Sequence, residues 1–307
     1  MQKVYRLIAK VAVKQHPVLI VGESGTGKEL VARAIHSKGP WRDRPFVPID
    51  CGALTPTVIE SEMFGHVRGA FTGATQGRQG LLAAAGEGTV FLDEIAELPV
   101  ELQSKLLRAL QEREIKPLGS NERIQMKARI VAATNQDIEA AIKRGIFRKE
   151  LYFRLNVVSI KLPPLRERRE DIPGLVRHFL EKHKANESGI TGVSDEVMAR
   201  LISYDWPGNV RELENCIQRA LALGTVPEIR MTDLPSNLLC SVGEPRQDQG
   251  TLTTLQELEQ RAILEALKAT KGDRLRAAKL LGIGKTTIYR KLKEYGLEDV
   301  APPPPSC

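Results

Sequence analysis

A glycine-rich segment between an apolar run and a helical pattern constrains the fold of this chain more than any other feature. Residues 18–21 are aliphatic and end at Gly22, and beyond Lys28 apolar residues recur at the spacing of one helix face. Strand, glycine loop and helix in this order are typical of a phosphate-binding loop.

The chemistry of the segment supports that interpretation. Glycines let backbone N–H groups turn toward a β-phosphate, the helix N-terminus adds a favourable dipole, and Lys28 reaches the β- and γ-oxygens. A glycine turn can also be a packing device, but the lysine and an acidic motif downstream favour a nucleotide. The sequence predicts that ATP binds at Gly22, Glu23, Ser24, Gly25, Thr26, Gly27, Lys28 and Glu29.

Strand-like and helix-like segments alternate along the first half of the chain. Residues 46–49, 89–92 and 129–133 read as strands, and residues 58–64 and 100–111 read as helices. This alternation predicts an α/β fold, in which helices cover both faces of a parallel sheet.

Changes in pattern and composition predict the domain organisation. We expect an α/β core at residues 1–170, a helical lid at 171–240, a linker at 241–251, a second helical domain at 252–297 and a proline-rich tail at 298–307. Between residues 171 and 223 we expect helices only.

Two adjacent acids follow the strand-like run at residues 89–92. Asp93 can hold Mg²⁺ through water, and Glu94 can accept a proton from, or orient, a water that attacks the γ-phosphate. The alternative is a helix cap. Asn135, after the next strand, can sense the γ-phosphate or be an ordinary turn residue. Because Glu29 stands where Ser or Thr commonly supplies a hydroxyl to the metal, Mg²⁺ must rely on phosphates, water and Asp93.

The positive charge is concentrated near the C-terminal end. The net charge is +7, and nine basic residues and one acid lie between Lys268 and Lys293, which leaves 36 of the 45 basic and 37 of the 38 acidic residues elsewhere. This local basicity predicts a polyanion-binding surface.

Two helices are expected within this basic segment. Residues 275–281 form an apolar-faced helix, residues 282–283 a turn, and residues 285–295 a second helix with Ile288 and Leu292 inward. A helix-turn-helix inserts its second helix in the major groove of DNA, although basic helices are often only solvated faces.

The outward residues of the second helix are the candidates for DNA contact. They are Lys285, Thr286, Thr287, Tyr289, Arg290, Lys291 and Lys293. We expect base contacts from Thr287 and Arg290 and phosphate contacts from the three lysines.

Membrane, disulfide and zinc chemistry are not indicated. No run approaches the roughly 20 apolar residues that cross a bilayer, and residues 1–14 lack a cleavage-site pattern, so we expect a cytoplasmic protein without a membrane partner. The four cysteines and five histidines lack the spacing of a disulfide framework or zinc site.

One hexapeptide without helical or strand periodicity holds a single aromatic side chain. It consists of Gly69, Ala70, Phe71, Thr72, Gly73 and Ala74. Phe71 has no obvious core partner and its glycines allow movement, which indicates a moving part that meets another protein. The alternative is a surface turn whose ring folds back on the domain.

Six motifs together resemble the bacterial sigma-54-dependent transcription activators, which are ring-forming AAA+ ATPases. The motifs occupy residues 22–29, 62–66, 69–74, 91–94, 164–168 and 206–213. Residues 277–283 are similar to the Fis-type DNA-binding domains of these activators. The resemblance covers almost the whole chain and implies an AAA+ core, a helical lid, a helix-turn-helix domain, a ring of six or seven subunits and a place in a two-component system.

The resemblance also implies roles for three arginines and for the hexapeptide. Arg148 and Arg154 match the arginine fingers that reach the γ-phosphate held by a neighbouring subunit, whereas from the residues alone they are ordinary surface charges. Arg211 matches a sensor arginine on the lid, with a salt bridge to Glu212 or Glu214 as the alternative. Residues 69–74 match the loop that contacts sigma-54.

Two features depart from the family pattern. Asp50 occupies the place of an asparagine that restrains the catalytic glutamate in many relatives, and a carboxylate beside Glu94 would repel it or share its proton, which makes Asp50 a switch candidate. The chain also begins almost at the first strand, so we expect a shortened chain or a member controlled by a separate protein.

The predicted function is transcription activation driven by ATP hydrolysis. The protein binds an upstream site on double-stranded DNA, assembles as a ring and moves the Phe71 loops against sigma-54 RNA polymerase holoenzyme, which opens the promoter. One rival is an AAA+ motor that translocates nucleic acid without a sigma factor. The other is a DNA-binding regulator that uses ATP only as a ligand and does not turn it over.

Overall fold

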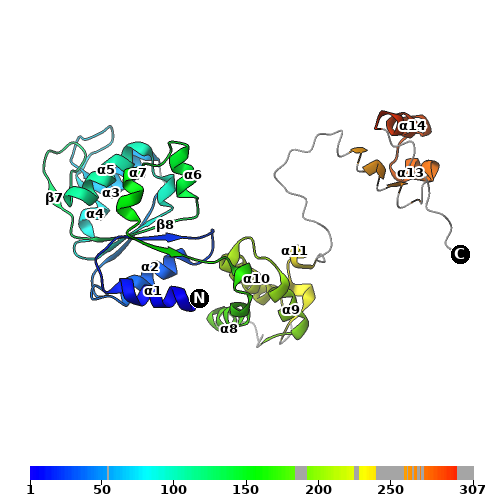
Figure 1. Cartoon of the computed structure of the whole chain (residues 1–307), viewed down its shortest axis with the longest axis horizontal. Helices are drawn as coiled ribbons and strands as arrows, with labels where there is room; N and C mark the ends of the chain where they lie inside the picture. Colours follow the sequence, from blue (N-terminus) through cyan, green and yellow to red (C-terminus); the bar gives the residue numbers. More distant parts are fainter. Residues whose placement is uncertain are drawn as a thin grey trace. The chain divides into compact units, whose positions relative to one another are not determined.

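The computed structural model describes most of the chain, in two compact units (Figure 1). The units are Met1–Cys240 and Ser241–Cys307. The described residues are 1–53, 55–183, 192–224, 228–239, 259–260, 262–264, 266–267, 270 and 273–295. The expected linker at 241–251 and tail at 298–307 lie outside them.

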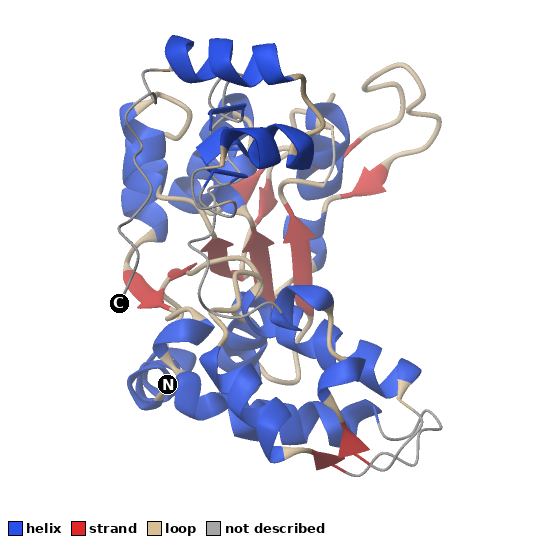
Figure 2. Cartoon of the chain, turned by 90° about the vertical axis from the view of Figure 1, so that its right-hand side faces the viewer, coloured by secondary structure: helices blue, strands red, loops and turns tan. Residues whose placement is uncertain are grey.

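The first unit contains a five-stranded parallel sheet, which confirms the predicted α/β fold. Its strands, in spatial order, are β2 (Phe46–Asp50), β5 (Thr89–Asp93), β8 (Arg129–Thr134), β1 (Val18–Val21) and β9 (Val158–Lys161). These strands run side by side in Figure 2. The sequence analysis missed β9, an edge strand in which only Ile160 is buried.

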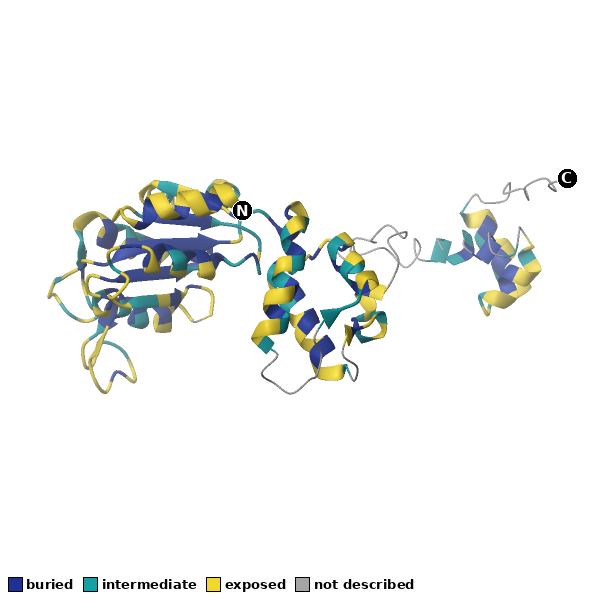
Figure 3. Cartoon of the chain, turned by 90° about the horizontal axis from the view of Figure 1, so that it is seen from below, coloured by how far each residue is buried: buried dark blue, intermediate teal, exposed yellow. Residues whose placement is uncertain are grey.

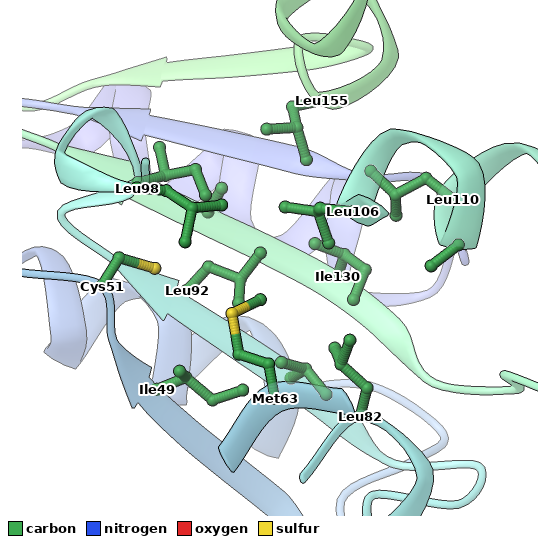
Figure 4. Packing of buried hydrophobic residues seen from close by; sticks show 14 of the residues in the cluster. Ile49, Cys51, Met63, Leu82, Leu92, Leu98, Leu106, Leu110, Ile130 and Leu155 are labelled. Atoms are coloured by element: carbon green, nitrogen blue, oxygen red, sulfur yellow. The ribbon is translucent and has the colours of Figure 1, made fainter. Parts of the chain in front are cut away.

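Helices cover both faces of the sheet, as expected. One face packs on α3 (Pro56–Phe64), α4 (Leu81–Ala84), α5 (Val100–Glu112), α6 (Ile138–Lys143) and α7 (Lys149–Leu155). The other packs on α1 (Gln2–Ala12) and α2 (Lys28–Ser37). Neighbouring strand residues alternate between the two cores because successive strand side chains point to opposite faces. Leu92 faces Met63 and Leu106 in the larger core (Figure 4), whereas Phe91 belongs to the smaller one.

Helix α1 was not predicted, although its pattern is visible in the sequence. Val4, Ile8 and Val11 recur at helical spacing, and all three are buried against the sheet. The buried guanidinium of Arg129 joins the helix to the sheet, since its two terminal nitrogens donate to the Val11 and Ala12 carbonyls at 2.8 and 3.1 Å. Burial lowers the pKa of Arg129 to about 10.

Two small antiparallel hairpins extend the unit beyond the sheet. One pairs β3 (Gly65–His66) with β4 (Arg78–Gln79), and the other pairs β6 (Glu114–Ile115) with β7 (Ile124–Gln125). The first hairpin carries residues 69–74 at its tip.

The helical lid completes this unit. The short turns η2 (Leu165–Glu167) and η3 (Arg169–Asp171) lead from the core into it, and it contains α8 (Ile172–His183), α9 (Asp195–Ser203), α10 (Asn209–Leu223), η5 (Met231–Asp233) and α11 (Ser236–Leu239). Trp206 is fully buried in the lid core, and its indole N–H donates to the Leu201 carbonyl at 2.7 Å. The expectation of helices alone was wrong at β10 (Gly192–Val193), which pairs in parallel with β11 (Glu228–Ile229) and closes the lid.

The second unit contains α13 (Arg274–Leu280) and α14 (Lys285–Glu294) around a small core, drawn dark blue in Figure 3. Asp273 caps α13 by accepting from the N–H groups of Leu275 and Arg276. Ile288 and Leu292 face inward, as predicted. The apolar face expected on the first helix is present and consists of Ala277 and Ala278 with Leu281 packed beside them, whereas Leu275 and Leu280 are exposed.

Within the described residues, no helix is long and apolar enough to cross a bilayer.

Candidate functional site

The glycine-rich loop forms a closed turn between β1 and α2. Gly25 and Gly27 have φ angles of +75° and +97°, values that favour glycine, and the Thr26 hydroxyl donates back to the Glu23 carbonyl at 2.8 Å. Lys28 begins α2 and is 6% exposed. Its ammonium donates to the Gly22 carbonyl at 3.2 Å, so the loop and its lysine form one hydrogen-bonded ring.

The two predicted acids lie at the carboxyl end of β5, beside this loop. Glu94 Oε1 is 3.1 Å from Lys28 Nζ, and Glu94 Oε2 accepts the backbone N–H of Asn135 at 3.0 Å. Glu94 has a φ of +47°, which turns its side chain out of the strand direction. The parallel sheet therefore brings the ends of β1, β5 and β8 to one carboxylate.

Both acids are half-buried, and the effect of that burial is clear at Asp93. Burial raises its pKa above the ordinary value, while the Glu94 N–H, which donates to Asp93 Oδ1 at 3.0 Å, opposes the shift. The described residues contain no group of three or more His, Cys, Asp or Glu side chains that could hold a metal ion. Because Glu94 pairs with Lys28, Asp93 is the carboxylate that remains for the metal, which fits Mg²⁺ held mainly by phosphates and water.

Glu29 lies away from these groups. Its carboxylate pairs with Arg33 one turn later on α2, at 2.7 Å, and is half exposed. The assignment of Glu29 to the nucleotide-binding loop stays a prediction.

Asp50 lies on the strand next to the one that carries the two acids. It ends β2 in register with Asp93, is exposed, and accepts the Gly52 N–H at 2.9 Å. Among the described residues no hydrogen bond or ion pair joins Asp50 to Glu94. The Asp50 carboxylate turns back onto its own loop while Glu94 pairs with Lys28, and the switch role of Asp50 stays a prediction.

The lid reaches the glycine-rich loop through Arg211. Its guanidinium donates to the Ser24 hydroxyl at 3.2 Å. The alternative salt bridges are not formed, because Glu212 accepts the Gly208 N–H and Glu214 pairs with Lys182.

Three lid residues at this junction carried no individual prediction. Arg166 pairs with Glu23, Arg168 donates to the Thr26 carbonyl, and Asn209 donates to Glu23 and Ser24. All three lie within the motifs at 164–168 and 206–213. Sequence spacing could not reveal their partners, which are 142 to 186 positions away.

The two candidate finger arginines lie exposed at α7. Arg148 precedes the helix and its Nε donates to the Val100 carbonyl at 3.4 Å. Arg154 donates to the Leu110 carbonyl at 2.8 and 3.3 Å. Both rest on α5, and within the described residues neither forms a hydrogen bond with the glycine-rich loop of its own chain.

The hexapeptide forms a folded turn with an aromatic contact. The Gly69 N–H donates to the Ala74 carbonyl at 2.9 Å, and the Phe71 ring lies 5.0 Å from the His66 ring, centre to centre. Phe71 is half-buried against His66 and belongs to none of the hydrophobic cores formed by the described residues. Gly69 and Gly73 have positive φ angles, and no heavy atom lies within 4 Å of the Cβ position of either. The loop is folded but has open space around its glycines.

The candidate DNA-binding residues lie on α14 with two exceptions to the outward pattern. Lys285, Thr286, Tyr289, Arg290 and Lys293 are exposed, and Thr287 is half-buried. Lys291 instead faces Glu259 at 2.8 Å, and this hydrogen bond raises the pKa of Lys291. The phosphate contact expected from Lys291 is contradicted by this geometry, because its ammonium already binds a carboxylate of its own unit.

Four features define a P-loop ATPase fold of the AAA+ class. They are a phosphate loop after β1, paired acids after β5, a five-stranded parallel sheet and a lid with an arginine at the loop. A helix-turn-helix unit follows this fold in the chain. Residues 1–161 match the family described as the sigma-54 interaction domain, residues 166–251 match the AAA+ ATPase lid domain, and residues 254–295 match the bacterial regulatory proteins of the Fis family. The chain belongs to the sigma-54-dependent transcriptional regulators.

Individual relatives agree with this assignment. The regulatory protein AtoC of Escherichia coli is 46% identical over 94% of this chain, and the response regulator PilR of Pseudomonas aeruginosa is 43% identical over 95%. The chain spans 65% and 67% of their lengths, respectively. The crystal structure of NtrX from Brucella abortus superposes with a TM-score of 0.76 at 34% identity over 96% of this chain and 67% of NtrX. NtrX has also been solved with ADP and with ATP.

Proposed function

We propose that this chain binds and hydrolyses ATP at the junction of Lys28, Asp93 and Glu94. The observation that carries the proposal is the contact of one Glu94 carboxylate with both Lys28 and the Asn135 backbone. Three strands of the sheet thus deliver a phosphate-binding cation, a potential base and a neighbouring amide to one point. The structures of NtrX in complex with ADP and with ATP support nucleotide binding by this chain.

Each residue at the junction has a task that its position allows. Residues 22–29 wrap the phosphates with backbone N–H groups, and Lys28 neutralises the β- and γ-oxygens. Glu94 takes a proton from the attacking water or orients it, and Asn135 reports the γ-phosphate to β8. Arg211 closes the lid over the nucleotide. Mg²⁺, held by phosphates and by Asp93 through water, would neutralise charge that develops between the phosphates.

We also propose that the chain assembles as a ring, in which Arg148 and Arg154 complete the site of the neighbouring subunit. Both are exposed and rest on α5, away from the loop of their own chain. A cation supplied in trans makes hydrolysis depend on assembly, because it stabilises transition-state charge only in the ring.

The output of the cycle is the opening of promoter DNA by sigma-54 RNA polymerase, reached through residues 69–74. A turn with two open glycines and a half-buried ring can present Phe71 to another protein after a small rearrangement. The exposed face of α14, without Lys291, holds the upstream DNA site. We place this activity in the cytoplasm and assign the core, lid and DNA-binding domain to residues 1–170, 171–240 and 252–297.

One experiment separates this function from its rivals. ATPase rate and sigma-54 open-complex formation are measured side by side for the parent chain, Phe71→Ala and Tyr5→Ala, which removes an exposed ring from α1. We expect Phe71→Ala to retain hydrolysis and lose promoter opening, while Tyr5→Ala retains both. Equal opening by Phe71→Ala, or opening without sigma-54, would exclude the proposal.

A further inference from the structure

We propose that Asn209 is the positioning residue that couples the lid to the phosphate-binding loop, and that it determines where Arg211 meets the nucleotide. The proposal rests on the proposed nucleotide function of the loop. It assigns to Asn209 a task in the alignment of the lid, distinct from contact with the nucleotide itself.

The Asn209 side chain joins three separate segments of the first unit. Its amide nitrogen donates to Glu23 Oε2 at 3.1 Å and to the Ser24 carbonyl at 3.0 Å. Its amide oxygen accepts the N–H of Leu165, in the connection between core and lid, at 2.8 Å. Asn209 is 0% exposed, so water does not replace these bonds if one partner shifts.

The backbone at Asn209 also connects the lid to the phosphate-binding loop. Asn209 has a φ of +54°, a left-handed value that asparagine tolerates better than most residues. This turn starts α10, and the N–H groups of Val210 and Arg211 both donate to the Gly25 carbonyl, at 3.0 and 3.3 Å. The first turn of the helix is therefore bonded to the phosphate-binding loop.

The contact is too close for either side to move alone. A Cβ at Gly25 would lie 2.2 Å from the Gly208 carbonyl oxygen, so lid backbone and loop backbone touch directly. Arg211 follows Asn209 by two positions on the same helix. A rotation of α10 about this contact displaces the Arg211 guanidinium from the phosphates, which is the movement that the Asn209 bonds resist.

A surface ion pair supports the buried amide from outside. Arg166 donates two bonds to the Glu23 carboxylate, at 2.6 and 2.8 Å. Bonds from Arg166 and then Asn209 lower the pKa of Glu23 to about 2, so the acceptor stays ionised. Both charged side chains are about 40% exposed, at 41% and 42%, and solvent weakens their attraction. Asn209 is the buried residue among Glu23, Arg166 and Asn209, so loss of its side chain should weaken nucleotide binding more than loss of the Arg166 side chain.

The test compares Asn209→Gly with the parent chain. Glycine accepts the left-handed backbone, so the variant removes the side-chain bonds without adding strain. Asn237→Ala is the matched control, because Asn237 donates to the Tyr204 hydroxyl within the lid and not to the loop. For each full-length variant, binding of a fluorescent ATP analogue, ATP turnover and thermal unfolding are measured.

We expect Asn209→Gly to weaken analogue binding about tenfold, the consequence of losing bonds to a charged group, while the control binds like the parent. A double-mutant cycle with Arg211→Ala identifies the cause. If Asn209 acts by positioning Arg211, the loss caused by Arg211→Ala shrinks in the Asn209→Gly background. A purely structural role would leave the two losses additive.

Two results would overturn the proposal. They are unchanged binding in Asn209→Gly, and fully additive losses in the cycle. If Asn209→Gly does not fold, Glu23→Gln and Arg166→Gln are put through the same cycle, and additive losses there count equally against it. Failure of the parent chain itself to bind the analogue would refute the proposed nucleotide function instead, so the two failures are distinguishable.

Discussion

The ammonium group of Lys28 lies 3.1 Å from the carboxylate of Glu94, across the gap between the phosphate-binding loop and the end of β5. The pair links the cation expected to bind phosphates with the base expected to act on water. Phosphate oxygens compete for Lys28, so a nucleotide that enters the site would free Glu94 to face the water. Lys28 and Glu94 thus either pair with each other, or bind phosphate and face the water, respectively.

Glu94→Gln should separate binding from hydrolysis. The amide keeps the shape of the side chain but cannot accept a proton, so we expect turnover to fall about 10²- to 10⁴-fold with ATP still bound. Steady-state turnover and analogue binding test this. Glu97→Gln, which alters a nearby acid bonded to Gln136, is the control and should retain turnover. Full activity in Glu94→Gln would mean that another group activates the water.

Arg148→Ala should inactivate only the site of a neighbouring subunit. We expect turnover to fall about 10³-fold, as for loss of an arginine finger. The Lys28→Ala variant lacks the phosphate-binding lysine but keeps Arg148. A mixture of the two variants should regain activity, because some subunit interfaces in a mixed ring then combine an intact Lys28 with an intact Arg148. The measurement is ATPase rate against mixing ratio. A mixture no more active than the sum of its parts would argue against action in trans.

His66 should hold Phe71 in its folded position. The Gln76 carbonyl can only accept, so His66 Nε2 donates to it at 2.9 Å, and His66 Nδ1 is hydrogen-bonded to the Ser61 hydroxyl at 2.7 Å. We expect His66→Ala to speed amide hydrogen exchange in residues 67–77 about tenfold, from the loss of two bonds and a ring contact. His66→Phe, which keeps a ring, should show a smaller change. Identical exchange in all three chains would show that the loop folds without His66.

The ion pair of Glu23 with Arg166 should cease to stabilise the folded state in acid. Because its pKa is lowered from 4.5 to about 2, Glu23 stabilises the folded state fully above its unfolded value and loses that contribution as the pH falls toward 2. Exposure limits the effect to about 1 kcal/mol or less. Urea unfolding of the parent and Glu23→Gln should differ at pH 6 and converge between pH 4.5 and pH 2. A difference independent of pH would exclude this linkage.

Lys291 and Lys293 should behave differently although they are two positions apart. Lys293 is exposed, so Lys293→Gln should reduce the salt dependence of DNA binding by about one unit of slope. Lys291 pairs with Glu259, so Lys291→Gln should leave the slope unchanged and lower the thermal midpoint of the second unit. Binding titrations at several salt concentrations and thermal scans decide this, and a reduced slope for Lys291→Gln would contradict the ion pair.

Local sequence was sufficient to predict a strand or helix wherever the residues of that segment alone determine its periodicity. The aliphatic runs before Gly22 and Asp93 predicted β1 and β5, and the helical spacing after Lys28 predicted α2, because strand and helix periodicity arise from the backbone of each segment. The parallel pairing of β1, β5 and β8 then places Gly22, Asp93 and Asn135 at the carboxyl edge of the sheet, as expected from the sequence. The missed β9 shows the limit of this method, since an edge strand with one buried residue has almost no pattern to read.

Side-chain partners from distant segments were decided only by the tertiary structure. Sequence could not show that Arg211 meets Ser24, that Arg166 pairs with Glu23, or that Lys291 binds Glu259. The clearest case is Asn209, which meets Glu23 across 186 positions. Such contacts depend on how whole elements pack, and burial then makes each polar group bind whatever partner that packing supplies. The sequence determined the parts of the nucleotide site, and the packing of the lid on the loop decided how those parts are held.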